Sequence, residues 1–445
     1  MTHYQLDRSE VRRLVESVRG GAATRSLSSA TSGPSSARSE LDEVAVARLF
    51  AISTWTTLVE PGDAVAGIVI GAVGADRALT MLIEGCAAAQ WREALPAELS
   101  HELTEADLDA AVERWRPRLS SRSALRALAA AARCGARLVI PADPVWPAGF
   151  ADLGAHAPLA LWVRGVLREL SHPGGSVAIV GSRDATNYGE HVAMDLASGL
   201  SDRGLAVVSG AAYGIDGMAH RASLASRGAT VAYLAGGVDR LYPSAHHELL
   251  LRVMASGAVV SELACGSAPT KWRFLQRNRL IAAASQATVV VEAGRRSGSL
   301  NTAGHAAALG RPLGAVPGPV TSATSAGCHR LLREYDAHCV TSAADIVELV
   351  FGPVGEPPRL VDDTPDSNDG ADVADGSGPG TGGGLRGDAA ETVRVLDALS
   401  RRAERTVDDV ARGAGMAPRA VVAVLGVLAL DGTVEETSKG WRRVG

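Results

Sequence analysis

The spacing of apolar residues divides the chain into regions of different texture. Residues 41–136 are rich in Ala and Leu, and Val44, Leu49 and Phe50 belong to an apolar stripe at helical spacing, which predicts a helical region. Farther along, short apolar runs alternate with helical segments. These runs cover residues 137–140, 177–180, 205–208, 230–234, 258–260, 288–291 and 313–316. Because they are rich in β-branched residues and do not alternate with polar ones, they predict an α/β fold whose core is an extended Rossmann-like open parallel sheet flanked by helices.

The pattern becomes helical again near the C-terminus. Residues 389–399, 406–414 and 418–430 predict three short helices, and residues 432–444 predict a β-hairpin. Three helices followed by a hairpin resemble a winged-helix module. The preceding residues 352–387 are acidic and rich in Pro and Gly, so they cannot bury enough apolar surface to fold and predict a linker.

A length of 445 residues agrees with several domains. The predicted segments are a disordered or uncertain extension (1–40), a helical, SAM-like domain (41–136), a Rossmann-like core (137–351), an acidic linker (352–388) and a winged-helix-like domain (389–445). The net charge is −5, but the linker alone carries −6, which leaves +1 for the remaining chain. The overall charge therefore neither supports nor excludes an anionic partner, and local placement of charge must decide.

Composition also bears on the compartment. The longest uncharged apolar run, residues 64–75, is too short to span a bilayer, and the first residues lack the basic flank and apolar stretch of a signal peptide. The five cysteines are scattered, with no Cys-x-x-Cys pair and no zinc-finger spacing. These features predict a cytoplasmic protein with reduced thiols, no membrane span and no metal site.

Two turns at predicted strand ends carry candidate chemistry. After the strand at 177–180, Gly181 allows close backbone approach, and Ser182 and Arg183 can bind an anion at the start of the next helix, although a tight strand–helix turn is the alternative. After the strand at 205–208, Asp216 and His220 are four residues apart, on one helix face. A catalytic or metal-binding pair is conceivable, but we favour a structural turn in which the aspartate caps the helix.

A basic cluster follows at residues 271–281. Its cations and aromatic residues are Lys271, Trp272, Arg273, Phe274, Arg277 and Arg279. Cations neutralise phosphates and flat side chains stack on bases, so this composition favours a site for single-stranded nucleic acid. The alternative is a solvated face on which the arginines pair with carboxylates.

A second candidate anion site begins where the strand at 288–291 ends. Glycines and small hydroxyl residues, among them Gly298 and Ser299, open a helix there, and Arg295 and Arg296 are adjacent. Backbone N–H groups at a helix start bind anions, so this turn predicts a phosphate contact.

Together, these motifs resemble those of the DNA processing protein A family (DprA, also called Smf). The matching elements are Gly181-Ser-Arg183, Ser209-Gly210, Gly214-Ile-Asp216, Ala219-His220, Tyr242-Pro243, Ser261-Glu262, Phe274 with Arg277-Asn-Arg279, Ser297-Gly298-Ser299 with Thr302, Val316-Pro317-Gly318 and Gly327-Cys-His329. The segments Asp143-Pro-Val-Trp146-Pro147 and Leu161-Trp162-Val-Arg-Gly165 extend the match upstream. No single element is specific, but their order over residues 177–340 is.

The resemblance implies a homodimeric protein that binds single-stranded DNA and loads the RecA recombinase onto DNA taken up in natural transformation, displacing single-strand-binding protein or sharing the strand with it. It implies neither catalysis nor a cofactor. Arg183, Arg277 and Arg279 would hold phosphates, with Lys271 and Arg273 of the same basic cluster beside them. Backbone or hydroxyl contacts would come from Gly181, Ser182, Gly210, Gly298 and Ser299, while Asp216 and His220 would shape a turn.

Two positions depart from the family pattern. Tyr213 stands where a Lys or Arg is usual, which removes one cation from the expected groove but offers a ring that can stack on a base. Leu275 stands where the family has a proline that stiffens the loop. Both departures bear on the affinity for DNA rather than on the mode of binding.

Two other functions compete with this interpretation. A nucleotide hydrolase of the phosphoribohydrolase type would carry a Pro-Gly-Gly-x-Gly-Thr loop and a catalytic glutamate, but the late turn here reads Pro317-Gly318-Pro319-Val320, and Glu262 and Glu292 lack a paired acid in sequence. A winged-helix regulator would need a basic recognition helix, whereas residues 418–430 contain one cation, Arg419. Arg442 and Arg443 in the predicted wing leave DNA contact there open.

Overall fold

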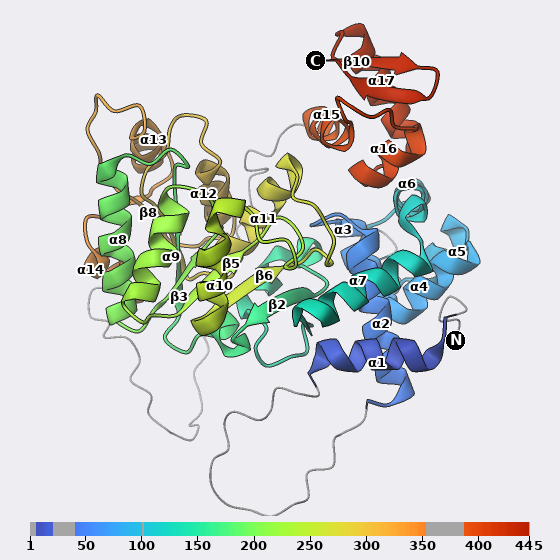
Figure 1. Cartoon of the computed structure of the whole chain (residues 1–445), viewed down its shortest axis with the longest axis horizontal. Coiled ribbons are helices and arrows are strands. Elements are labelled where there is room, and N and C mark those ends of the chain that lie inside the picture. The colour runs from blue at the N-terminus through green and yellow to red at the C-terminus, as the bar shows by residue number, and fades with distance from the viewer. Residues whose placement is uncertain (1–5, 21–40, 100–101, 353–386, 445) are drawn as a thin grey trace, which may run out of the picture.

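The computed structural model describes residues 6–20, 41–99, 102–352 and 387–444 (Figure 1). A helical unit precedes the sheet and a small C-terminal unit follows it. The helices of the first unit are α1 (Arg8–Arg19), α2 (Glu43–Leu58), α3 (Ala64–Val73), α4 (Ala75–Glu84), α5 (Ala88–Ala94), α6 (Glu105–Trp115) and α7 (Ser121–Cys134), with the short η1 (Arg116–Arg118) before α7. The division of the chain into domains at the boundaries given above stays a prediction.

Three buried tryptophans lie at the centre of the helical unit. The ring of Trp115 meets the ring of Trp55 edge-on at 5.1 Å and that of Trp91 at 6.2 Å. Their polar edges are largely satisfied, since the indole of Trp55 donates to Ala75 O and that of Trp115 donates to the Asp63 carboxylate, both at 3.0 Å. Large aromatic areas are thus buried, and of the three indoles that of Trp91 has a buried N–H with no partner among the described residues.

Helix α1 corrects one expectation from the sequence. Residues 1–40 were predicted to be a disordered or uncertain extension, but Arg8–Arg19 is a helix whose N-cap, Asp7, accepts a hydrogen bond from Ser9 N at 2.7 Å. Val11, Val15 and Val18, at helical spacing, are buried against α2 and α7. This periodicity was the available signal, whereas residues 1–5 and 21–40 lie outside the described part of the chain.

The sheet confirms the predicted α/β class. Its strand order is β1-β2-β6-β5-β4-β3-β7-β8-β9, and the seven strands from β6 to β9 in that order pair in parallel. The strands are β1 (Arg137–Val139), β2 (Leu161–Gly165), β3 (Ser176–Val180), β4 (Ala206–Ser209), β5 (Thr230–Tyr233), β6 (Ala258–Ser261), β7 (Ala287–Val290), β8 (Leu313–Ala315) and β9 (His338–Cys339).

One edge of the sheet differs from the expected parallel arrangement. β1 pairs with β2 and β2 with β6, both antiparallel. The connection between β1 and β2 contains only the short η2 (Ala148–His156), so it lacks the crossover helix that two parallel neighbours need. The run at 137–140 is therefore a strand, as predicted, but not a parallel one.

Helices cover both faces of the sheet (Figure 1). Because successive strand residues point to opposite faces, Val177 and Ile179 pack under one layer while Ala178 and Val180 pack under the other. The first layer contains α8 (Asn187–Asp202), α9 (Ile215–Ala225), α10 (His247–Ser256) and α14 (Ala343–Phe351), and the second contains α11 (Lys271–Ala283), α12 (Ser299–Ala308) and α13 (Ala326–Glu334). Short helices η3 (Leu167–Ser171) and η4 (Ser244–His246) lie in connections.

The C-terminal unit has its own apolar core around Val395, Val410 and Leu425. It comprises α15 (Gly387–Ala398), α16 (Val407–Ala414), α17 (Pro418–Leu430) and the antiparallel hairpin of β10 (Val434–Thr437) and β11 (Gly440–Arg443). In Figure 1 this unit, in red, lies beside the helical unit and next to α11. Most of the predicted acidic linker, residues 353–386, lies outside the described residues.

No single helix of the described segments has both the length and the apolarity needed to cross a membrane. Two bent pairs, α3 with α4 and α16 with α17, meet that criterion only when the members of each pair are taken together.

Candidate nucleic-acid interface

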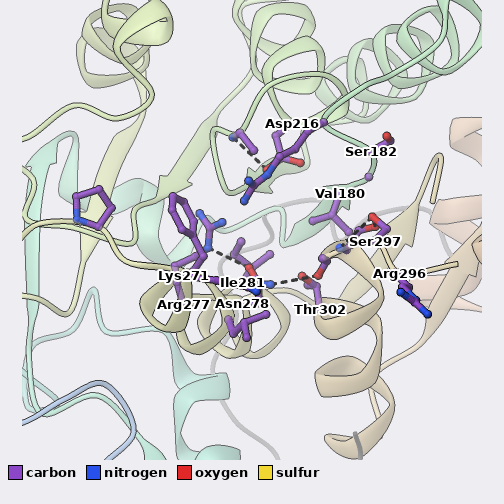
Figure 2. A pocket seen from close by; sticks show the side chains of 18 of the residues that line it. Val180, Ser182, Asp216, Lys271, Arg277, Asn278, Ile281, Arg296, Ser297 and Thr302 are labelled. Carbon is purple, nitrogen blue, oxygen red and sulfur yellow. Dashed lines mark hydrogen bonds between the residues drawn. The ribbon is translucent and has the colours of Figure 1, made fainter. Parts of the chain in front are cut away.

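A cavity of about 810 Å³ opens at the carboxyl ends of β3 and β7. The strand order reverses there, because β4, β5 and β6 follow β3 on one side while β7, β8 and β9 lie on the other. Open α/β sheets bind ligands at such a switch point. The polar residues that line the cavity include Ser182, Arg183, Asp184, Asp216, Thr270, Lys271, Arg277, Asn278, Arg296, Ser297, Ser299, Thr302 and Asp397, several of which appear in Figure 2.

The turn after β3 is shaped by close packing. A Cβ at Gly181 would lie 2.5 Å from the Ile215 side chain, and one at Gly214, whose φ is +68°, would lie 2.3 Å from Ser182 O. The Ile215 N–H donates to Ser182 O at 3.2 Å, which joins the turns after β3 and β4. Gly181, Ser182 and Arg183 thus line the cavity, and their contact with DNA stays a prediction.

Arg183 and Phe274 form an aromatic and cationic wall of the cavity. The exposed guanidinium of Arg183 lies over the Phe274 ring at 5.1 Å, and the Tyr242 ring is 5.8 Å from the same ring. Half of Tyr242 is exposed to solvent. This wall therefore offers both a positive charge and a flat surface. Tyr242, predicted only as part of a family motif, also belongs to it.

Arg277 is buried but lies at the cavity. Its Nη1 donates to Gly210 O at 2.7 Å and also to Tyr233 O, and its Nε donates to Asn278 Oδ1 at 3.1 Å. Burial lowers the pKa of Arg277 to about 10, partly offset by the charge of Asp216, so the group is still cationic at neutral pH. Carbonyl and amide oxygens hold this cation, with no ion pair to a carboxylate within 4 Å among the described residues.

Gly210 and Asp216 lie near Arg277, and of these two residues Asp216 also lines the cavity. Gly210, predicted to contact DNA, does not line the cavity, and a Cβ there would lie 2.4 Å from the Arg277 guanidinium. The Asp216 carboxylate accepts from Gly210 N at 3.1 Å and Ala212 N at 3.3 Å. Burial raises the pKa of Asp216, while Arg277 acts in the opposite direction.

Arg279 departs from the expectation of a free guanidinium at the same groove. Its Nη2 donates to Glu262 Oε2 at 2.6 Å, the residue is 3% exposed, and it does not line the cavity. Arg277 and Arg279 are two residues apart on α11, so they point to nearly opposite sides of the helix. Burial raises the pKa of Glu262, and the Arg279 charge opposes that shift.

Arg273 also lies away from the cavity. Its Nε and Nη2 donate to the two carboxylate oxygens of Glu60 at 3.0 and 2.7 Å. Arg118 donates to the same Glu60 at 2.5 Å. Of the basic cluster, Lys271 and Arg277 therefore line the cavity, whereas Arg273 and Arg279 have carboxylate partners, as in the alternative weighed from the sequence.

Tyr213 and His220 do not line the cavity either. Tyr213 is partly exposed and meets the His246 ring edge-on at 5.1 Å. His220 is fully buried, its Nδ1 lies 2.7 Å from Thr230 Oγ1, and burial lowers its pKa to about 3. A neutral His220 packed inside the fold has a structural role, since it has no access to a ligand in the cavity.

The start of α12 forms the opposite wall (Figure 2). Gly298 and Ser299 line it, and Ser297 Oγ lies 2.7 Å from Ser299 Oγ. Asn278 Nδ2 on α11 donates to Gly298 O at 3.3 Å, so the two walls are joined. Arg296, a neighbour of the predicted anion site, is exposed and lines the cavity.

The two carboxylates considered for an enzyme have other partners. Glu292 accepts from Thr186 N at 2.9 Å, from Thr186 Oγ1 at 2.6 Å and from Thr324 Oγ1 at 3.1 Å, and it does not line the cavity. Glu262 pairs with Arg279. Both therefore hold neighbouring segments together.

Fold and site together define a Rossmann-like protein with a cation-lined cavity at its topological switch point. The model of the family described as DNA recombination-mediator protein A matches residues 137–351. A DNA processing protein DprA of Mycobacterium tuberculosis is 48% identical over 321 residues, which cover 70% of this chain and 77% of that protein. This chain belongs to the DNA processing protein A family.

Two further comparisons agree with that assignment. The DNA processing protein DprA of Bacillus subtilis is 37% identical over 191 residues, covering 43% of this chain and 64% of that protein. The X-ray structure of DprA from Streptococcus pneumoniae superposes with a TM-score of 0.53 at 27% identity, covering 67% of this chain and 96% of that one. The resemblance inferred from the motifs is thus confirmed, and with it a role in DNA processing.

Proposed function

We propose that this chain is a recombination mediator that binds single-stranded DNA in the cavity between the β3 and β7 turns. The observation that carries the proposal is the placement of Arg277, a buried cation held by carbonyl oxygens at the cavity rather than by a carboxylate. Arg183, Lys271 and Arg296 surround the same cavity. Such a set of cations suits a polyanion.

Single strands fit this site better than duplexes. The ring of Tyr242 and the Arg183–Phe274 stack offer flat surfaces, and only unpaired bases can stack on them. Asn278 carries an amide at the cavity, but this amide donates to Gly298 O and Asn301 Oδ1 instead of being free to read a base edge. Binding is therefore expected to depend on phosphates and to be nearly blind to sequence.

Membership of the family supports a more specific proposal. The chain would act as a homodimer in the cytoplasm and load RecA recombinase onto DNA entering by natural transformation, where single-strand-binding protein competes for the strand. We propose no catalytic step, because the two glutamates that an enzymatic mechanism would use hold structural hydrogen bonds. Incubation with nucleoside monophosphates is expected to release no free base.

The test uses the only two lysines of the chain as a matched pair. Lys271 lines the cavity, whereas Lys439 is exposed on the C-terminal hairpin. Fluorescence anisotropy with a labelled oligo(dT) at several salt concentrations gives the slope of log K against log salt for each variant. Lys271→Ala should make that slope shallower by roughly 0.7 to 1, one phosphate contact, and Lys439→Ala should leave it unchanged.

Two results would contradict the proposal. A duplex of the same length that binds as tightly as the single strand would remove the stacking argument. The reverse pattern, with Lys439→Ala altering the slope and Lys271→Ala having no effect, would favour the winged-helix-like unit as the DNA-binding part.

A further inference from the structure

One carboxylate of the cavity comes from the C-terminal unit. Asp397, near the end of α15, lines the cavity together with the cations of the core, although 125 residues separate it from α11. Its Oδ2 accepts a hydrogen bond from Trp272 N at 3.3 Å. An acidic group from another part of the chain thus lies at a site that otherwise suits phosphates.

The Trp272 N–H is a natural anion ligand. Helix α11 begins at Lys271, and its N-cap, Thr270, accepts from Arg273 N at 3.3 Å. The first N–H groups of a helix have no partner within the helix, and the helix dipole makes that end positive. Asp397 thus accepts from a backbone N–H of the kind that binds phosphate oxygens at helix starts.

Further contacts hold α15 over this site. Arg394, three residues before Asp397 on the same helix, lies over the Trp272 ring at 5.7 Å. Its Nε donates to Ala414 O at 2.8 Å, which joins α15 to the end of α16. Asp397 at the cavity and Arg394 beside Trp272 therefore belong to one helix, which is joined to α16.

The helical unit anchors the other side of the C-terminal unit. Arg118, a buried residue, donates through Nε to Arg412 O at 2.8 Å and through Nη2 to Gly413 O at 3.3 Å. In return, Arg412 Nε donates to Pro117 O at 3.0 Å. Because Arg118 also pairs with Glu60, which pairs with Arg273 of α11, the docked position is linked to the basic helix itself.

We propose that the docked C-terminal unit restricts access of single-stranded DNA to the cavity, with the Asp397 carboxylate in the place of a DNA phosphate. DNA then binds at this end of α11 only after α15 has moved away, since two anions cannot share the Trp272 N–H. This inference rests on the proposed function of the cavity. By reciprocity, bound DNA weakens docking of the unit as much as docking weakens DNA binding.

The first test compares Asp397→Asn with the wild type in the full-length chain. Asp397 is exposed, so the substitution removes a charge without disturbing a core. We expect oligo(dT) to bind about 5- to 10-fold more tightly at low salt, which corresponds to a modest coupling between two sites. Asp431→Asn is the control, because Asp431 is an exposed residue of the same unit that does not line the cavity.

The second test measures hydrogen exchange of backbone amides in α15 and at the start of α11. Saturating oligo(dT) should speed exchange within α15 by releasing it, while the Trp272 amide should stay protected by DNA. Equal affinity of the wild type and Asp397→Asn, or α15 protection unchanged by bound DNA, would overturn the inference and leave the proposed function standing. If neither protein binds oligo(dT), the proposed function itself fails.

Discussion

Helix α11 carries similar cations that meet different surroundings. Lys271 and Arg277 line the cavity, and Arg277 is held by carbonyl oxygens. Arg273 pairs with Glu60, and Arg279 pairs with Glu262. The partners of each cation therefore separate the basic cluster into two groups. A cation held by neutral groups keeps its charge available to a ligand. A cation neutralised by a carboxylate contributes to the packing of the fold.

The largest effect is expected among the carboxylate-paired cations, from Glu60→Ala. This change leaves the buried guanidinium groups of Arg118 and Arg273 without their carboxylate, and an uncompensated buried charge costs about 3–5 kcal/mol. Urea unfolding at pH 7 measures the loss. Glu334→Ala is the control, because the pair of Glu334 with Arg330 is exposed and its loss should not shift the midpoint. Equal midpoints for Glu60→Ala and the wild type would contradict the structural role of the pair.

The same residue predicts a pH dependence. Burial alone would raise the pKa of Glu60, but the charges of Arg273 and Arg118 outweigh it and hold the pKa well below its usual value. The stabilisation is therefore present above the unfolded-state pKa of about 4.3 and is lost as the pH falls toward the folded-state pKa. The difference in stability between the wild type and Glu60→Ala should shrink between pH 7 and pH 3.

An intermediate effect distinguishes a carboxylate-paired cation from a cation exposed at the cavity. Arg279→Ala leaves Glu262 alone in the interior and should cost about 3 kcal/mol, while the salt slope of oligo(dT) binding by the folded variant stays unchanged. Arg183→Ala should do the opposite, because Arg183 is exposed at the cavity: the unfolding midpoint is unchanged and the slope becomes shallower by about one unit. A shallower salt slope for Arg279→Ala would show that Arg279 contacts DNA and would contradict this prediction.

The smallest effect is expected for Tyr213→Ala. Tyr213 lies outside the cavity and only its edge-on contact with His246 is lost, so stability should change by about 0.5 kcal/mol or less. The affinity for oligo(dT), measured by anisotropy, should stay within about twofold of the wild type, since a lost base stack would cost at least about 1 kcal/mol. A larger loss of affinity would show that DNA extends beyond the cavity toward His246. Tyr242→Ala, which removes a ring that lines the cavity, is the variant with which that loss is compared.

Much of the fold was predictable because it depends on local pattern. The apolar runs predicted the parallel strands β3 to β8, and helical spacing predicted the helices of the C-terminal unit, since burial on one or both faces leaves a periodic signature. The parallel β9, only two exposed residues long, and the antiparallel β2 were not predicted. Helix α1 was missed although Val11, Val15 and Val18 carry the same signature in a short segment. The antiparallel pairing of β1 could not be predicted from the sequence, because the direction of pairing depends on how the connection between two strands runs in space.

The sequence alone determined that the turns after the parallel strands meet at one sheet edge, and Gly181, Arg183, Lys271 and Ser299 line the cavity there, whereas Gly210 does not. Only the tertiary structure decided which cations are neutralised. Glu60 is 213 residues from Arg273, and Asp397 is 125 residues from Trp272. Electrostatic interaction depends on distance in space and on burial, and neither is written in the order of residues along the chain.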